Sequence, residues 1–365
     1  AAKRMTEATG YEAKTIHRLL EVSGGIEDGD SSHFEKNEDN PIEADAVILD
    51  EMSMVDIHLM YSLLKAIVPG TRLILVGDSN QLPSVGPGNV LKDIIDSKAF
   101  SVVRLSKIYR QAESSHIVLN AHKINAGELI TLDNKNKDFF FFEKKDVRSV
   151  MGALVYLVKT RLPEYIGASP FEIQVLTPMR KGELGVEHLN EVLQYYLNPA
   201  SESKKEKEGR TGVFREGDKV MQVKNNYKLE WKITNAKGFS IEEGLGVFNG
   251  DMGIIKQINT YSERITVVFD ENREAEYPFS SLDELELAYA ITIHKSQGSE
   301  YPAVVLPLLS GPPILCNRNL LYTAITRAQK CVAIAGRQSM VEQMIHNETE
   351  QKRYSGLNDC LKEGL

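Results

Sequence analysis

The chain has 365 residues, of which 42% are hydrophobic and 26% charged, a composition typical of a soluble globular protein with two or three domains. No apolar run approaches the length of a membrane-spanning helix. The three cysteines are scattered, which argues against a disulfide framework and against a metal cluster and favours the reducing cytoplasm. The net charge of −8 counts mildly against nucleic-acid binding, but it leaves room for a basic groove on an acidic body, because binding depends on local charge.

The first 41 residues predict two short helices followed by a polar loop. Residues 1–8 and 14–20 have helical patterns, and Thr15 is suited to cap the second helix. Judged from the residues alone, Thr15 and His17 are explained by capping and packing. Residues 23–41 are rich in Gly, Asp, Asn and Glu and predict an exposed loop or a loose hairpin.

Two apolar strands, joined by a helical stretch, each end in polar residues. Residues 46–49 lead into Asp50 and Glu51. Residues 72–78 form a second apolar strand that ends in an acid, Asp78, and Gln81 follows it. A right-handed crossover would bring the two carboxyl ends side by side, at the edge where open α/β sheets bind ligands. There Asp50 could hold Mg²⁺, Glu51 could orient or deprotonate a water, and an amide such as Gln81 could sense a γ-phosphate. For the Asp-Glu pair alone, two solvated acids at a strand end are an equally good explanation.

Several motifs carry a family resemblance. Residues 50–56 (DEMSMVD) and 77–88 (GDSNQLPSVGPG) resemble motifs II and III of superfamily-one helicases. The resemblance is strongest to the RecD-like group, the 5′-to-3′ DNA helicases related to the alpha chain of exodeoxyribonuclease V. Residues 107–111, 291–301 and 317–328 resemble motifs IV, V and VI. The resemblance covers nearly the whole chain and implies ATP and Mg²⁺ as cofactors, with Asp50 as the metal ligand.

The resemblance also implies roles for individual residues. Those expected in catalysis are Asp50, Glu51, Gln81, Arg110 and Arg327, the two arginines reaching the γ-phosphate across an interdomain cleft. Those expected to bind the nucleotide are Gln297, Gly298 and Glu300. Those expected to contact DNA are Thr15, His17, Thr177, Arg180, Thr292, His294 and Ser296.

Beyond residue 100 the α/β pattern continues, gives way to a different pattern and then returns. Strands of the α/β part are expected at residues 102–105, 139–142, 172–177, 303–308 and 331–335. Residues 201–209 are charged and predict a solvated linker. Short strands at residues 217–223, 251–255, 265–269 and 274–277 then predict a small all-β barrel. Residues 285–290 are expected to lead back into the α/β fold.

The patterns predict an α/β fold, and the resemblance implies two RecA-like parallel-sheet motor domains, the first incomplete, with an inserted SH3-like β-barrel. The resemblance implies that the polar loop acts as a pin at the fork where the DNA strands part. The expected bounds are 1–104 for the first motor domain, with the pin at about 23–41, 105–210 and 284–350 for the second, 211–283 for the barrel and 351–365 for a C-terminal tail.

The implied function is ATP-dependent helicase activity, with 5′-to-3′ movement on single-stranded DNA and unwinding of a duplex fork. The expected partners are recombination or repair proteins, and no association with a membrane is expected. A P-loop requires Gly-Lys followed by Ser or Thr, and none of the 26 glycines precedes a lysine. The chain is therefore expected to be a fragment that starts after the P-loop and is inactive alone. The alternatives are a non-hydrolysing DNA-binding accessory module and the alpha subunit of a multi-subunit helicase-nuclease.

Overall fold

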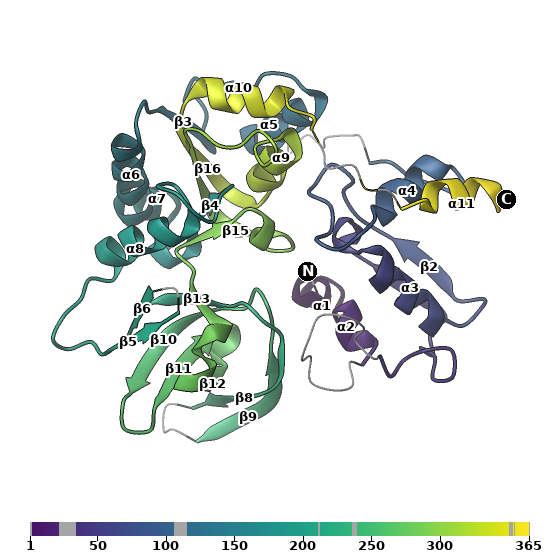
Figure 1. Cartoon of the computed structure of the whole chain (residues 1–365), viewed down its shortest axis with the longest axis horizontal. Coiled ribbons are helices and arrows are strands. Elements are labelled where there is room, and N and C mark those ends of the chain that lie inside the picture. The colour runs from purple at the N-terminus through teal and green to yellow at the C-terminus, as the bar shows by residue number, and fades with distance from the viewer. Residues whose placement is uncertain are drawn as a thin grey trace. The chain divides into compact units, whose positions relative to one another are not determined.

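The computed structural model describes residues 2–21, 34–105, 115–210, 212–235, 239–349, 353 and 355–364, apart from the side chains of Lys3 and Arg4. The chain divides into two compact units (Figure 1). The first unit comprises Ala1–Tyr109, Gln297–Ser299 and Thr349–Leu365, and the second comprises Arg110–Ser296 and Glu300–Glu348. Each unit has an apolar core of its own.

The first unit contains the predicted strand-helix-strand arrangement. Strands β1 (Ala46–Leu49) and β2 (Arg72–Leu75) pair in parallel, with Leu49 opposite Leu75. The unit also contains the helices α1 (Ala2–Thr9), α2 (Ile16–Leu19), α3 (Ile57–Ala66), α4 (Val90–Ser97) and α11 (Leu357–Glu363), and the 3-10 turn η1 (Met52–Met54). The core lies on one face of β1, because Val47 and Leu49 are buried whereas Ile48 is 55% exposed.

The prediction of a strand at residues 102–105 is wrong. The backbone at residues 101–105 is irregular, and the side chains of Val103 and Leu105 are 87% and 95% exposed. Apolar, β-branched residues favour a strand only where a neighbouring strand accepts their hydrogen bonds and a core covers their side chains. Within the described part of the chain, residues 102–105 have neither.

A five-stranded parallel sheet forms the centre of the second unit. Its order is β14 (Ala290–Thr292), β4 (Ile173–Thr177), β15 (Tyr301–Leu308), β16 (Ala328–Gly336) and β3 (Phe139–Glu143). The helices of this α/β part are α5 (His116–Ala126), α6 (Val147–Tyr156), α7 (Leu162–Ile166), α8 (Val186–Leu197), α9 (Arg318–Thr326) and α10 (Gln338–His346), with a π-helical turn at Leu157–Arg161. The run of four phenylalanines forms β3, and Phe139 and Phe141 point into the core as a buried strand requires.

A second sheet follows the predicted all-β pattern. Its seven strands are antiparallel and run in the order β13 (Leu285–Leu287), β7 (Lys219–Gln222), β10 (Met252–Asn259), β11 (Arg264–Phe269), β12 (Glu274–Pro278), β8 (Asn226–Thr234) and β9 (Ser240–Val247). Two details differ from expectation. Residues 285–287 pair with β7 and so still belong to this sheet, and the end of the predicted linker forms β5 (Glu206–Gly209), which pairs with β6 (Gly212–Arg215).

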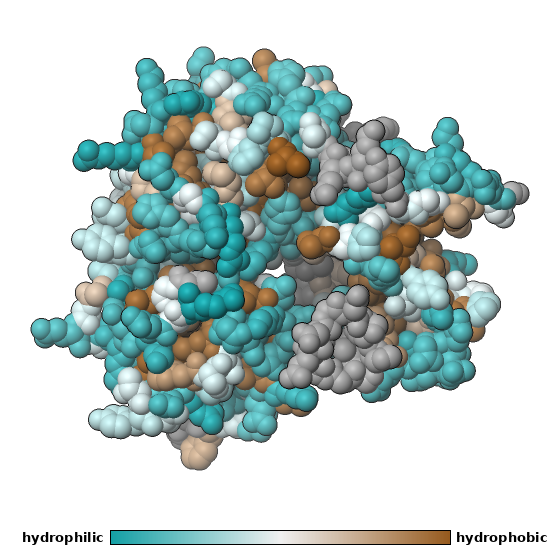
Figure 2. Space-filling model, viewed as in Figure 1, coloured by the Kyte–Doolittle hydropathy of each residue, from teal (hydrophilic) through white to brown (hydrophobic). Residues whose placement is uncertain are grey.

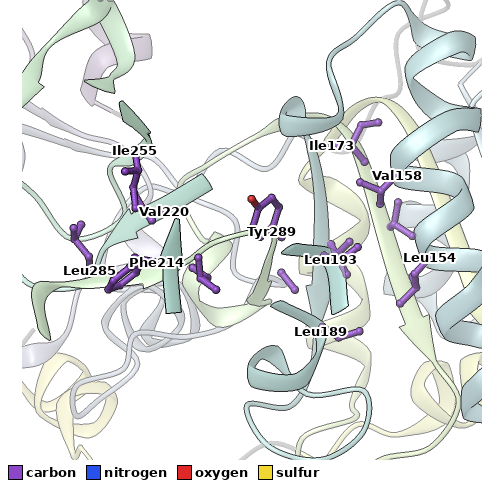
Figure 3. Close-up of a cluster of buried hydrophobic side chains, with 14 of the residues drawn as sticks. Leu154, Val158, Ile173, Leu189, Leu193, Phe214, Val220, Ile255, Leu285 and Tyr289 are labelled. Atoms are coloured by element: carbon purple, nitrogen blue, oxygen red, sulfur yellow. The ribbon is translucent and has the colours of Figure 1, made fainter. Parts of the chain in front are cut away.

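One continuous apolar core joins this β-sheet to the parallel sheet. Figure 3 shows Tyr289 between side chains of the β-rich part, such as Val220 and Phe214, and those of the α/β part, such as Ile173 and Leu193. The two parts therefore pack as one body.

The same junction contains a buried carboxylate, Asp218. It accepts hydrogen bonds from Gln194 (2.6 Å), Asn198 (2.7 Å), the Tyr289 hydroxyl (2.9 Å) and the backbone of Arg215 (2.7 Å). Burial raises the pKa of Asp218, and these bonds oppose that shift. The network links α8, β7 and the segment before β14 through bonds that are satisfied only in this arrangement.

The surface agrees with the composition. Hydrophilic residues cover most of the face shown in Figure 2. None of the described helices is both long and apolar enough to cross a membrane.

Candidate functional site

The sharpest backbone feature of the first unit lies directly after β1. The carboxylate of Asp50 accepts the backbone N–H of Glu51 (2.8 Å), and Glu51 itself is left-handed, with φ 56° and ψ 40°. This conformation costs a non-glycine residue about 1–2 kcal/mol. The next residue, Met52, donates to Val76 at the end of β2 (3.0 Å), so the chain rejoins the sheet at once. The turn therefore sets the direction of one side chain, Glu51, at the expense of backbone strain, which is frequent at functional sites.

Gln81 follows the neighbouring strand, as predicted. Its backbone N–H donates to the carbonyl of Asp78 (3.3 Å), and its side-chain Nε2 donates to the Asp78 carboxylate (3.4 Å). Within the described part of the chain, Oε1 of Gln81 is buried and accepts no hydrogen bond. A buried amide oxygen without a donor costs about 1–3 kcal/mol, so this position suits an amide whose oxygen accepts a hydrogen bond from a bound molecule.

Asp50 has the chemistry of a magnesium ligand. Its carboxylate is exposed, and the hydrogen bond from Glu51 uses one of its two oxygens. Mg²⁺ is usually bound through one or two carboxylates plus phosphate oxygens and waters, rather than by an all-protein cage. The described residues contain no group of three or more His, Cys, Asp or Glu side chains placed to hold a metal.

The residues predicted to bind the nucleotide fall into two places. Gln297 and Gly298 group with the first unit, where Nε2 of Gln297 donates to the carbonyl of Leu82, next to Gln81 (2.8 Å). Gly298 has a φ of +73°, a value that favours glycine. Glu300 lies in the second unit and accepts a hydrogen bond from Gln329 (3.2 Å).

The second unit brings the predicted DNA contacts of two segments together. Thr177 and Thr292 stand opposite each other at the carboxyl ends of β4 and β14, and Ile293 donates to the carbonyl of Thr177 (3.1 Å). Thr177 and Ser296 are fully buried, and their hydroxyls donate to the carbonyls of Leu184 and Ile293 (2.7 Å each). These two hydroxyls therefore hold the strand-end loops in place.

The exposed rim of these loops carries charge. Arg180 donates to Glu286 (2.6 Å), and Lys295 donates to the other oxygen of the same carboxylate (3.1 Å). Burial alone would raise the pKa of Glu286, but the hydrogen bond from Arg180 and the charge of Lys295 outweigh it and lower the pKa. His294 keeps part of its ring exposed, yet it is crowded enough by protein atoms that desolvation lowers its pKa.

Glu286 was not found by sequence reasoning. It lies on β13, 106 residues after Arg180. The only local signal is its place between two buried leucines, Leu285 and Leu287, which turns its side chain to the opposite face of the strand.

Thr15 and His17 are used for capping and packing, as the residues alone suggested. The Thr15 hydroxyl accepts the N–H of Arg18 (3.3 Å), and the half-buried ring of His17 lies 6.0 Å from that of Phe34. Burial lowers the pKa of His17, with the charge of Asp56 acting against it. A role of either residue in contacting DNA stays a prediction.

The base of the predicted pin is formed by paired backbone. The backbone N–H groups of Glu35 and Lys36 donate to the carbonyls of Glu21 (2.9 Å) and Leu20 (3.1 Å). Residues 22–33, which make up most of the predicted pin, lie outside the described residues.

Of the two predicted arginine fingers, only Arg327 is described. It ends α9, its side chain is 4% exposed, and its carbonyl accepts the N–H of Tyr301 (2.8 Å). Arg110 and the rest of the motif IV segment lie outside the described residues.

Comparison with family models finds three matches along the chain. An AAA domain matches residues 1–87, an ATP-dependent RecD-like DNA helicase SH3 domain matches residues 189–269, and a UvrD-like helicase C-terminal domain matches residues 287–335.

Curated relatives match over most of the chain. The ATP-dependent RecD2 DNA helicase of Deinococcus radiodurans is 35% identical over 336 residues, which are 92% of this chain and 41% of that protein. The RecBCD enzyme subunit RecD of Mycolicibacterium smegmatis is 30% identical over 364 residues, 97% of this chain and 60% of that protein. The chain thus spans less than two thirds of the length of either relative.

Among solved structures, the Pif1 helicase from Bacteroides in complex with ADP-AlF3 and single-stranded DNA is similar, with a TM-score of 0.51 and 19% identity over 93% of this chain and 81% of that one. At this identity the likeness supports the fold alone, and it confirms the expected RecA-like parallel-sheet core. Together, the family models and the curated relatives confirm the predicted resemblance to the RecD-like helicases over most of the chain, including the SH3-like domain that the sequence predicted.

Proposed function

We propose that this chain provides ATP-hydrolysing and DNA-contacting parts of an ATP-dependent DNA helicase that moves 5′ to 3′ on single-stranded DNA and unwinds duplex. The observation that supports this best is the strained turn at Glu51, which follows Asp50 at the end of β1, beside the strand that leads to Gln81. A carboxylate held in one direction at this edge of a parallel sheet fits a residue that acts on a bound molecule.

In this proposal each residue has one task. Asp50 holds Mg²⁺, and the metal neutralises charge on the phosphates when it is bound. Glu51 orients the attacking water and accepts its proton. Gln81 donates through Nε2 to the γ-phosphate, and its unpaired Oε1 accepts from the water.

Arg110 and Arg327 stabilise the charge that develops on the transferred phosphoryl group. Gln297, Gly298 and Glu300 contact the nucleotide.

The DNA-binding part of the proposal rests on the ends of β4 and β14. Arg180, Lys295 and His294 are exposed or partly exposed there. The two cations, Arg180 and Lys295, suit the phosphate backbone, and the ring of His294 can donate a hydrogen bond to it. Thr177 and Ser296 act by shaping these loops, and Thr292 caps the turn, since its hydroxyl accepts the N–H of Lys295 (3.3 Å). Thr15 and His17 contribute a further DNA contact.

The decisive experiment is Glu51→Gln in the full-length protein. The side chain keeps its size but loses its basicity, so DNA-stimulated ATP hydrolysis should fall by roughly 10²–10⁴-fold. Affinity for a fluorescent ATP analogue should stay within a few-fold, since the charge on Asp50 remains. Glu43→Gln, which changes an exposed glutamate just before β1, is the matched control and should keep full activity.

Near-normal turnover of Glu51→Gln would overturn the catalytic assignment. A wild-type protein that binds DNA but hydrolyses no ATP would favour the alternative of an accessory module. The names of the RecBCD relatives support the other alternative, a subunit of a helicase-nuclease. Native mass measurement of the protein isolated from its own cells separates a single chain from such a complex.

The proposal includes a cytoplasmic location, which fits a protein that acts on DNA. The cysteines of the described part, Cys316, Cys331 and Cys360, are all free thiols, as a reducing compartment would leave them.

A further inference from the structure

The loop that follows Gln81 is held by a side chain from the other end of the chain. Arg353 donates through Nη1 to the carbonyls of Gly86 (2.5 Å) and Gly88 (2.9 Å) and to the Ser84 hydroxyl (3.1 Å), and through Nη2 to the carbonyl of Ser84. All these partners belong to the first unit. The planar guanidinium has five N–H donors in a fixed fork, so one Arg can serve several carbonyls at once, which a Lys cannot do.

The opposite side of this loop is seated on the start of α3. The backbone N–H of Ile57 donates to the carbonyl of Pro87 (3.0 Å), and Asp56 caps the helix by accepting the N–H of Leu59 (2.8 Å). At Gly86 a Cβ atom would lie 1.9 Å from Oδ2 of Asp56, so only glycine fits. The loop is thus clamped between Arg353 and the segment that follows Asp50 and Glu51.

The tail that carries Arg353 has a separate anchor. The hydroxyl of Ser355 donates to the carboxylate of Asp93 on α4 (2.5 Å), and Asn358 donates to the carbonyl of the same residue (3.3 Å). Leu357 packs against the core of the first unit, and Figure 1 shows α11 alongside α4. These contacts dock the tail without touching the carbonyls of residues 84–88, so Arg353 is not needed simply to attach it.

We propose that Arg353 is a positioning residue for ATP hydrolysis, which holds the loop at residues 84–88 and thereby fixes Gln81 and the start of α3 relative to Asp50 and Glu51. The proposal rests on the function proposed above. Within the loop, the buried Ser84 hydroxyl donates to the carbonyl of Gly86 (3.1 Å), and the other residues are two glycines, a proline and the exposed Val85, so Arg353 supplies most of the side-chain hydrogen bonds to the loop's carbonyls. Without the guanidinium, its carbonyls would turn to water, and Gln81 would keep its bonds to Asp78 but lose the support of the loop that follows it.

The test compares Arg353→Ala, Arg353→Lys and Ser355→Ala in the full-length protein. Hydrogen exchange of the peptide spanning residues 80–89, measured without nucleotide, should become roughly tenfold faster in Arg353→Ala, because the loop opens locally. The kcat of DNA-stimulated hydrolysis should fall by about tenfold or more while KM for ATP stays within about twofold, since small misplacements of a catalytic amide are costly. Arg353→Lys should be intermediate, and Ser355→Ala should match wild type in both measurements.

Unchanged exchange in Arg353→Ala would overturn the proposal whatever happens to turnover. Faster exchange with unchanged kcat would also overturn it, since Arg353 would then be purely structural. Loss of folding in Arg353→Ala, seen by circular dichroism, leaves Arg353→Lys to decide by the same two measurements. A wild-type protein that hydrolyses no ATP would instead overturn the proposed function, and the exchange data would still show whether Arg353 orders the loop.

Discussion

Among single residues, Lys219 has an unusual environment in the second unit. Its ammonium group is buried and donates to the carbonyl of Phe171 (2.7 Å) and the side-chain oxygen of Gln174 (2.8 Å), neither of which is a carboxylate. Burial lowers its pKa from 10.5 to about 7, with the charge of Glu172 acting weakly against the shift. The bonds satisfy the donors but do not balance a charge, so the folded state favours the neutral amine.

This predicts a pH dependence of stability that Lys219→Met should remove. Between pH 7 and 10.5 the unfolded chain holds the proton that the folded chain has released, so the free energy of unfolding rises with pH in this window. Below pH 7 both states are protonated and the full cost of burial applies. Urea unfolding at pH 7 and pH 9 should show a rise in wild type larger, by about 1–3 kcal/mol, than in Lys219→Met.

The control is Lys181→Met, which removes an exposed lysine and should keep the wild-type pH dependence. Equal pH dependence in Lys219→Met and wild type would show that Lys219 stays charged in the folded protein.

A second prediction at this scale concerns Glu286, which lies between two cations of the proposed DNA-binding rim. Its carboxylate competes with phosphate for Arg180 and Lys295. Glu286→Gln should therefore tighten binding of single-stranded DNA a few-fold and steepen the slope of log K against log salt by about 0.7, the value of one further phosphate contact. Fluorescence anisotropy with a labelled oligonucleotide over a range of salt concentrations measures both.

Glu183→Gln makes the same change of net charge at an exposed site nearby and should have a smaller effect. Weaker binding by Glu286→Gln than by Glu183→Gln would mean that the carboxylate positions the two cations for DNA rather than competing with it.

At the scale of elements, the apolar patterns predicted the α/β parts well. The strand before Asp50, the phenylalanine strand β3 and the helix α3 have a buried face whose spacing is visible in the sequence, and the strand before Gln81 has a partly buried one. The hairpin β8–β9 was not predicted because much of it is exposed and its outward positions carry Lys and Glu, so no continuous apolar face marks it. The strand prediction at residues 102–105 failed for the opposite reason. These residues have strand propensity, but in the part of the chain that the structure describes no neighbouring strand pairs with them and no core covers their side chains.

The candidate site divides in the same way. The turn at Glu51 and the place of Gln81 follow from a local strand-helix-strand pattern and were predictable. Glu286 and Arg353 reach their partners from 106 and up to 269 residues away, and no local pattern indicates such contacts. Burial and long-range pairing, rather than residue type, decide their roles.

The packing of β15 against β16 gives a prediction at this scale. A Cβ atom at Gly336, the last residue of β16, would lie 1.8 Å from the carbonyl oxygen of Leu308 on β15. Gly336→Ala should therefore lower the free energy of unfolding by about 1–3 kcal/mol or more, because neighbouring strands cannot separate without losing hydrogen bonds. Equilibrium unfolding in urea measures the change.

Gly152→Ala serves as the control for that experiment. Gly152 lies on the exposed side of α6 with nothing within 4 Å of an added Cβ atom, so the same substitution should stabilise the protein by about 0.5–1 kcal/mol through helix propensity. If both variants shifted stability in the same direction, the close approach of β15 and β16 would not determine the outcome.

For the whole molecule, the main question is how single-strand movement would become duplex separation. The described base of the predicted pin is firmly held, since Phe34 packs against the core of the first unit and the backbone pairs at Leu20 and Lys36. An element with such a base could resist the force of a duplex driven against it. Gripping a single strand, in contrast, is proposed for the ends of β4 and β14 and needs no such element.

Replacing residues 24–33 by a Gly-Ser linker of equal length therefore tests the separation of the two tasks. The change keeps Phe34 and the paired base, so DNA-stimulated ATP hydrolysis and translocation on single strands should match wild type in stopped-flow assays. Unwinding of a duplex with a 5′ overhang should be abolished or strongly weakened. A Gly-Ser replacement of residues 201–203, an exposed stretch before β5, should leave all three activities intact. Undiminished unwinding by the first variant would show that residues 24–33 form an ordinary surface loop and that strand separation depends on another part of the molecule.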